Sequence, residues 1–468
     1  MSVFTVFLKW SSTTLKRMRL FILCVAIGWA NIAIPPKAFA QGGFSVIRDT
    51  EIENTIRVYA APLFEAAGLD PSAVSIHIIN DRSLNAFVAG GQRIFIHTGL
   101  LMKTKTPAEV IGVLAHEIGH ITGGHLSRQQ KNLENANNQS IIALVLGGAA
   151  ALAAQSADPL IAGLMAKSTV GQRSFLAYNR TMEQAADQAA LGFLEATGQS
   201  AQGLYDFLAL LLEQEKIYSA GGNAYSRSHP LNADRLRHVE DHLAKSAFSQ
   251  SKTSELIYSM HRRMRGKLKG FINPPDQILR EYDALDPDFG ARYARAIALS
   301  RLQDIDGAVA IVDELIATSP KDPFFYELKG ELLVDGGRTR EAIEPYKKAL
   351  TILPWAALIK VGLAQIQLES ESTAELEAAR DNLKEALRYE PELSGAWRFL
   401  ATAEGKLGNA GGASLALAEE ALLRGNKDGA LSHVKRAMVG LPEGSPSWFR
   451  AQDIESAAKK PTDHSDLN

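Results

Sequence analysis

Five residues, His116-Glu117-Ile118-Gly119-His120, form the pattern His-Glu-x-x-His. On a helix, side chains four positions apart lie on one face, so both imidazoles could bind one Zn²⁺ at about 2.0 Å. Zinc lowers the pKa of a bound water to about 7, so the neighbouring carboxylate could take its proton as it attacks a peptide carbonyl. The motif therefore predicts a peptidase with Glu117 as general base.

A catalytic zinc site needs three protein ligands and one open position. His125 is an unsuitable third ligand, because the extended pattern His-Glu-x-x-His-x-x-Gly-x-x-His requires a histidine where this chain has Leu126. We expect His125 to pack or to form a hydrogen bond nearby instead.

Glu183 is the better candidate for the third ligand. If residues 178–187 are helical, Glu183 and Asp187 share a face that is otherwise small and apolar. Carboxylates are rarely buried without a cation or a donor. Zinc would be the cation for Glu183. The second ring nitrogen of a ligating histidine would be the hydrogen-bond donor for Asp187. The alternative is a surface carboxylate pair with Arg180.

The helix that carries the motif has a clear start. Thr106 is suited to be the N-cap, Pro107 takes the first helical position, and Glu109 completes a capping box. Apolar residues around the motif indicate that this helix is buried, so its polar side chains need partners there.

A small sheet is expected before this helix. Residues 51–67 have helical apolar spacing. Residues 74–79 and 93–97 are β-branched runs typical of strands, and the turn at Gly90-Gly91 separates them.

The N-terminus has the pattern of a secretory signal peptide. Residues 1–40 hold five basic residues and no acidic one, and a basic run at residues 16–19 precedes an uncharged stretch at residues 20–34. The ending Ala38-Phe39-Ala40 predicts cleavage after Ala40. An uncleaved anchor is the alternative, although about 15 apolar residues are fewer than a spanning helix needs. Cys24, the only cysteine, would leave with the signal.

A second apolar run covers residues 141–154, and residues 159–165 continue its character. About 14 residues are short for a membrane span. We interpret residues 141–165 as a buried helix or a lid, with peripheral contact to a membrane as the alternative.

The C-terminal half contains a repeat. Pro320 and Pro354 lie 34 residues apart, which is the period of tetratricopeptide repeats. Gly330 falls where two helices cross closely, and Tyr346 takes the bulky core position. Small residues recur where paired helices should pack, namely Ala296, Ala308, Ala342, Ala349, Ala379, Ala386, Ala418, Ala430 and Ala437. About four repeats would stack into a solenoid with a protein-binding concave surface, and an irregular helical bundle is the alternative.

The composition is that of a globular multidomain protein, with 46% hydrophobic and 22% charged residues and a formal net charge of -2. Without residues 1–40 the charge is about -7, which argues against a nucleic-acid partner, because polyanions need concentrated Lys and Arg. The basic run from His261 to Lys269 is expected to be a solvated helix face rather than an anion-binding patch.

These residues resemble gluzincin-type zinc metallopeptidases related to the CAAX-processing and heat-shock membrane proteases. In particular, the chain resembles the periplasmic proteases with tetratricopeptide repeats that assist outer-membrane β-barrel assembly. The segments that carry the resemblance are Asn85-Ala86-Phe87, Gly99-Leu100-Leu101, Val113 to His120, Asn179-Arg180 with Glu183 and Asp187, and Ser228-His229-Pro230.

The resemblance implies that His116, His120 and Glu183 ligate one zinc ion and that Glu117 is the catalytic base. It also implies that His229, in a loop, approaches the metal as a regulatory plug and a fourth ligand. The protein would then be a periplasmic zinc metalloendopeptidase and chaperone that degrades misassembled outer-membrane β-barrel proteins and contacts the barrel-assembly machinery. The alternative is a chaperone or adaptor that acts through its repeats, with a closed or structural zinc site.

The expected fold class is mainly α, with an α+β zinc metallopeptidase domain that contains a small sheet, followed by an α-helical tetratricopeptide-repeat solenoid. The expected order of segments is a signal peptide at 1–40, the peptidase domain at 41–270, a linker at 271–286, the repeats at 287–442 and a C-terminal tail at 443–468.

Overall fold

The computed structural model describes residues 45–125, 169–217, 225, 229–230 and 233–460. The signal peptide predicted at 1–40 and the apolar run at 141–165 lie outside the described residues. Within the described ranges, no helix is both long and apolar enough to cross a membrane.

A small four-stranded sheet lies in the first part of the chain. Its order is β1 (Val46–Ile47), β2 (Ser75–Ile79), β4 (Arg93–His97) and β3 (Ala86–Ala89). β2 and β4 are parallel, whereas β1 pairs antiparallel with β2 and β3 pairs antiparallel with β4. The strands expected at 74–79 and 93–97 are confirmed, and so is the helix expected at 51–67, which is α2 (Thr50–Ala66).

The turn at Gly90-Gly91 joins β3 to β4, so it does not separate the two expected strands directly. Both glycines have positive φ, 54° and 95°, which a tight hairpin requires and which glycine adopts without strain. β3 has only four residues, too few to show an alternating pattern in the sequence.

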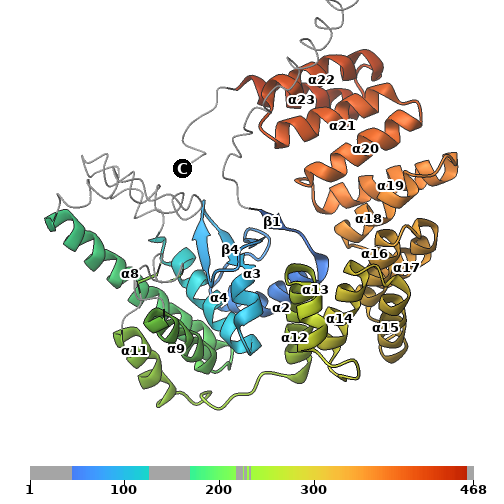
Figure 1. Cartoon of the computed structure of the whole chain (residues 1–468). Helices are drawn as coiled ribbons and strands as arrows, with labels where there is room; N and C mark the ends of the chain where they lie inside the picture. The colour runs from blue at the N-terminus through green and yellow to red at the C-terminus, as the bar shows by residue number, and fades with distance from the viewer. Residues whose placement is uncertain (1–44, 126–168, 218–224, 226–228, 231–232, 461–468) are drawn as a thin grey trace, which may run out of the picture. The chain divides into compact units, whose positions relative to one another are not determined.

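Helix α4 (Pro107–Thr122) carries the motif and packs against α2, α8 (Thr169–Ala196) and α9 (Gln202–Ile217) (Figure 1). Short α3 (Thr98–Lys103) follows β4 directly. The capping box is confirmed, because the Glu109 amide donates to the Thr106 side chain and the Thr106 amide donates to Glu109 Oε1 at 2.9 Å. The start of the buried helix is therefore fixed by its own sequence.

Small residues bring α4 into backbone contact with α8 and α9. A Cβ on Gly119 would lie 2.6 Å from the carbonyl oxygen of Ala186 in α8, and one on Gly112 would lie 2.6 Å from the amide of Leu204 in α9. Ala186 itself is fully buried. The close approach holds the face of α4 that carries the motif against α8.

The C-terminal half consists of helix pairs, as the repeat pattern predicts. After α11 (Ala233–Leu243), α12 (Glu255–Ile272) and α13 (Pro275–Glu281), the pairs are α14 (Phe289–Arg301) with α15 (Ile305–Thr318), α16 (Pro323–Asp335) with α17 (Thr339–Ile352), α18 (Ala357–Gln367) with α19 (Thr373–Tyr389), α20 (Ser394–Lys406) with α21 (Ala410–Leu423), and α22 (Lys427–Gly440) with α23 (Pro446–Lys459). All the alanines singled out by the repeat are fully buried. A Cβ on Gly330 would lie 2.6 Å from the Tyr346 ring, which explains the glycine at this crossing.

The number of helix pairs differs from the expected repeats. Residues 392–442, expected to be one repeat, contain α20, α21 and α22, and α23 lies in the stretch expected to be a tail. Gly425, with a φ of 71°, and the N-cap Asn426 connect α21 to α22 without a proline, so proline spacing cannot reveal this boundary. Similarly, α13 lies in the expected linker. The exact division into domains stays a prediction.

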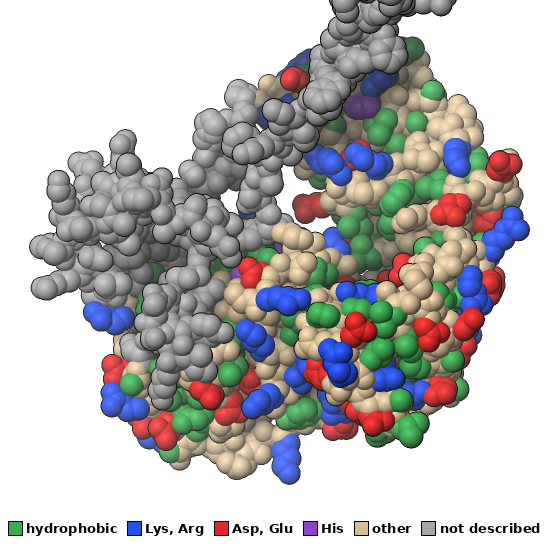
Figure 2. All heavy atoms as spheres, in the orientation of Figure 1, with side chains coloured by type: hydrophobic (Ala, Val, Ile, Leu, Met, Phe, Trp, Pro, Cys, Tyr) green, Lys and Arg blue, Asp and Glu red, His purple; other side chains and the backbone are tan. Residues whose placement is uncertain are grey.

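Charged side chains of both signs are interleaved on the face of the molecule in Figure 2. Lys and Arg form surface ion pairs with neighbouring acids, for example Lys329 with Asp313 at 2.6 Å and Arg338 with Asp306 at 2.8 Å. The face in view therefore presents mixed charge rather than a concentrated basic surface.

The expectation that the basic run His261 to Lys269 is a solvated face is wrong for its buried side. Lys267 is 1% exposed, and its Nζ lies 2.7 Å from Asp49 Oδ2. Arg263 Nη2 lies 2.6 Å from Glu51 Oε1, and the hydroxyl of Tyr293 donates to Glu51 Oε2 at 2.8 Å. Acids far away in the sequence thus neutralise this side of α12 and join it to the start of α2 and to α14.

Replacing Lys267 with Met is expected to lower the free energy of unfolding by about 3 kcal/mol, because the buried Glu51 and the partly buried Asp49 lose a cation. Urea unfolding followed by circular dichroism measures this change. Lys269→Met on the same helix is the matched control, since Lys269 pairs with the partly exposed Glu281 and should cost less than about 1 kcal/mol. Equal unfolding midpoints for the two variants would contradict a structural role of the buried network.

Candidate metal centre

Four buried side chains converge beside α4. His116 and His120 come from α4, Glu183 comes from α8, and His229 follows α9 in the chain. One ligand atom from each of the four lies within 4.8 Å of the others. The structure thus brings together the predicted ligands from three separate segments.

The distances between these atoms suit a single small cation. The Nε2 atoms of His116 and His120 are 3.1 Å apart, and each lies 3.3 Å from a carboxylate oxygen of Glu183. Nδ1 of His229 lies 3.3 Å from Nε2 of His116 and 3.2 Å from Glu183. Ligand atoms placed tetrahedrally at about 2.0–2.1 Å from zinc are about 3.3 Å apart. Three imidazole nitrogens and a carboxylate also form a donor set that zinc prefers.

Glu117 lies next to the cluster but outside it. Its side chain is fully buried, and neither carboxylate oxygen has a hydrogen-bond partner among the described residues. Oε1 lies 3.5 Å from Nε2 of His229. Burial raises the pKa of Glu117 above its usual range. A cation beside this buried carboxylate, such as a metal in the cluster, would favour its ionised form.

Asp187 and Arg235 lie behind the cluster. Oδ1 of Asp187 lies 2.8 Å from Nδ1 of His116. Arg235 donates from Nε to Asp187 Oδ2 at 2.7 Å and from Nη2 to Oδ1 at 2.8 Å, and its Nη1 lies 2.9 Å from Glu183 Oε2. Burial alone would raise the pKa of Asp187, but the charge of Arg235 lowers it to about 2. An ionised Asp187 can hold the His116 proton on Nδ1 and leave Nε2 facing the cluster.

The ionisation of the ligands is set by their neighbours. Burial would lower the pKa of His116, but its hydrogen bond to Asp187 raises that pKa to about 9. Burial lowers the pKa of His120 to about 3. Burial would raise the pKa of Glu183, but His229 and hydrogen bonds from the other histidines hold it well below its usual range. Since only neutral imidazole ligates, a cation must displace a proton from His116, and its affinity should fall at low pH.

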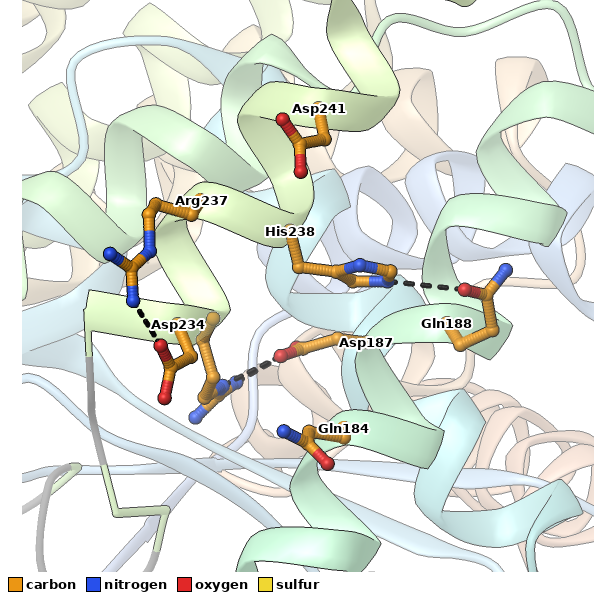
Figure 3. Close-up of a pocket in the computed structure, with 8 residues that line it drawn as sticks. Gln184, Asp187, Gln188, Asp234, Arg237, His238 and Asp241 are labelled. Carbon is orange, nitrogen blue, oxygen red and sulfur yellow. Dashed lines mark hydrogen bonds and ion pairs between the residues drawn. The ribbon is translucent and has the colours of Figure 1, made fainter.

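A polar pocket between α8 and α11 adjoins this arrangement (Figure 3). It is lined by Gln184, Asp187, Gln188, Asp234, Arg235, Arg237, His238 and Asp241. His238 contacts Gln188 at 3.1 Å, and Arg235 contacts Asp187, so two polar contacts join α11 to α8. Helix α11 thereby fixes Asp187 in its place behind His116.

No motif or spacing along the chain points to Arg235 or Tyr225. Arg235 is 48 residues from Asp187, and the only hint of its burial is that it shares one face of α11 with buried Val239. Tyr225 is fully buried and stacks on His229, with ring centroids 4.5 Å apart and planes 27° apart. Both contacts depend on how distant segments fold together, which spacing along the chain does not reveal.

Comparison with known proteins supports a peptidase. Residues 47–243 match the model of peptidase family M48. The beta-barrel assembly-enhancing protease of Escherichia coli O157:H7 is 26% identical over 412 residues, which cover 86% of this chain and 82% of that protein. Metalloprotease YcaL of Escherichia coli (strain K12) is 28% identical over 182 residues, which cover 38% of this chain and 65% of that protein. The crystal structure of MamA aligns with 35% of this chain and 91% of its own, with 20% identity and a TM-score of 0.27.

The matched range includes the whole buried cluster from His116 to His229, together with Arg235. The helix pairs from α14 to α23 lie beyond that range, and the similarity to the Escherichia coli O157:H7 protease covers most of the chain. Residues 47–243 are therefore similar to peptidase family M48, and the chain is a metalloendopeptidase in which the helix pairs from α14 to α23 follow the matched range.

Proposed function

We propose that the chain is a periplasmic zinc metalloendopeptidase and chaperone in the quality control and assembly of outer-membrane β-barrel proteins. The observation that carries the enzymatic part is the set of ligand atoms 3.1–3.3 Å apart beside the buried carboxylate of Glu117. The cellular role is supported by the name of a relative that is 26% identical over most of the chain. The signal-like pattern of residues 1–40 supports export.

His116, His120 and Glu183 would hold the zinc ion, which supplies a Lewis acid for the attacking water and the peptide carbonyl. Glu117 accepts the proton of that water and delivers it to the leaving amine, which suits a carboxylate whose pKa is raised by burial. Asp187 fixes the tautomer of His116, and Arg235 keeps the carboxylate of Asp187 ionised and also pairs with Glu183.

His229 gives the proposed site a closed state. Its Nδ1 lies 3.3 Å from Nε2 of His116 and 3.2 Å from Glu183, so it would occupy the fourth position that a catalytic zinc site keeps open for its substrate. Stacking of Tyr225 on the imidazole favours this placement. In the closed state the chain would act through its repeats as a chaperone or adaptor, and peptide hydrolysis would require His229 to leave.

Replacing His229 with Ala is expected to raise kcat/KM for a short peptide about tenfold, if about nine-tenths of the molecules are closed. One zinc ion per chain should remain, because three ligands are left. A fluorogenic peptide assay and elemental analysis measure the two quantities. A fall in activity would instead make His229 a participant in catalysis, and unchanged activity with unchanged zinc affinity would eliminate the closed state.

The test of function compares an unfolded outer-membrane β-barrel protein, the same protein after folding, and an unfolded soluble protein of similar size. The zinc-loaded chain should degrade the unfolded barrel protein fastest. Chelation should stop degradation, and one equivalent of zinc should restore it. Equal rates for both unfolded proteins would remove the selectivity for barrels, and no cleavage by either the native chain or His229→Ala would overturn the enzymatic function.

A further inference from the structure

His125 lies directly behind the second ligand histidine of α4. Its Nδ1 is 2.9 Å from Nδ1 of His120, and the two rings meet edge to face at 79°. His125 is only 5% exposed. Nε2 of His120 faces the cluster, 3.1 Å from Nε2 of His116, so His125 contacts the ring nitrogen that points away from the cluster.

Two consecutive glycines bring His125 back onto the helix. Gly124 has a φ of 58°, in the left-handed region that glycine adopts without strain, and this turns the chain after α4. Gly123, the C-cap of α4, has an ordinary φ, yet a Cβ on it would lie 2.4 Å from Nε2 of His125. The first glycine therefore makes room for the imidazole, and the second supplies the turn.

The two α4 histidines have different partners on the side away from the cluster. His116 contacts the ionised Asp187 at 2.8 Å, and Arg235 reinforces that carboxylate. His120 contacts an imidazole instead. For Nε2 of His120 to face a metal as a lone pair, its proton must be on Nδ1, from which it donates to Nδ1 of His125.

We propose that His125 is a positioning residue for metal binding, accepting the Nδ1 proton of His120 and orienting its Nε2 toward the cluster. This inference rests on the proposed zinc site of His116, His120 and Glu183. Partners of this kind typically change metal affinity by about 10–100-fold when they are removed, because they fix the tautomer and the ring orientation of the ligand.

The test measures zinc affinity of the full chain by competition with a chromophoric chelator. His125→Ala should weaken zinc binding by about 10–100-fold. His125→Asn should retain most of the affinity, because its side-chain oxygen can occupy the place of Nδ1 as an acceptor. The Co²⁺-substituted protein provides a second readout, since His125→Ala should alter its visible absorption spectrum and His125→Asn should alter it less.

Gly123→Ala offers an independent route to the same contact. The added methyl should displace the His125 ring and weaken zinc binding like His125→Ala, yet have no further effect when His125 is already Ala. Zinc affinity of His125→Ala within twofold of the native chain, or equal losses in His125→Ala and His125→Asn, would overturn the proposal. Failure of the native chain to bind one zinc ion would instead overturn the underlying metal site.

Discussion

Replacing Glu117 with Gln is expected to lower kcat/KM for peptide hydrolysis by about 10³-fold or more while one zinc ion stays bound. The amide keeps the shape of the side chain but cannot accept the proton of the attacking water, and general acid–base groups typically contribute about 10²–10⁴-fold. Glu117 lies outside the set of four side chains proposed to hold the metal, so zinc content should not change. A fluorogenic peptide and elemental analysis of the same sample measure both quantities.

The matched control for this experiment is Glu240→Gln, because Glu240 is an exposed glutamate on α11. Its activity and zinc content should equal those of the native chain. Loss of zinc from Glu117→Gln would assign Glu117 to the metal ligands, and full activity of the zinc-loaded variant would eliminate it as the base.

Replacing Arg235 with Met is expected to lower the free energy of unfolding by about 3–5 kcal/mol at neutral pH. The guanidinium is 1% exposed and is shared by Asp187 and Glu183 at distances of 2.7–2.9 Å. Its removal leaves two buried carboxylates without their cation. Arg237→Met is the matched control on the same helix, because its pair with Asp234 lies at the surface (Figure 3).

The stabilisation by the pair of Asp187 and Arg235 should decrease at low pH. The pKa of Asp187 is about 2 in the folded chain and about 4 when unfolded, so its contribution is fully present above pH about 4 and is lost as the pH falls toward 2. Without Arg235 the pKa of Asp187 in the folded chain should rise. The difference in the free energy of unfolding between the native chain and Arg235→Met should therefore shrink as the pH falls from about 4 toward 2. Urea unfolding at several pH values measures it. A constant difference, or none at neutral pH, would contradict the role of Arg235.

The sequence reveals those parts of the site that lie on one helix. Spacing of three or four residues places His116 with His120, and Glu183 with Asp187, on common faces, and the capping residues at Thr106 and Glu109 fix where α4 begins. The repeat is equally local, because helix pairs return small residues to equivalent positions. Such features can be predicted without knowing which distant segments of the chain contact each other.

The remaining features depend on contacts between distant segments. Arg235 is recognised only once α11 lies against α8, and the burial of Lys267 depends on acids more than 200 residues earlier at Asp49 and Glu51. The contact of His125 with His120 is close in sequence, but its geometry depends on the space above Gly123. Sequence spacing alone does not show which charged groups lie beside these side chains, or how much space surrounds them.

The most direct test of the metal centre is an anomalous difference map, recorded at the zinc absorption edge from crystals of the zinc-loaded chain. We expect one peak per chain, at about 2.0–2.2 Å from Nε2 of His116, Nε2 of His120 and a carboxylate oxygen of Glu183. A peak bound by other residues, or no peak in crystals of protein that hydrolyses peptides, would contradict the proposed zinc site.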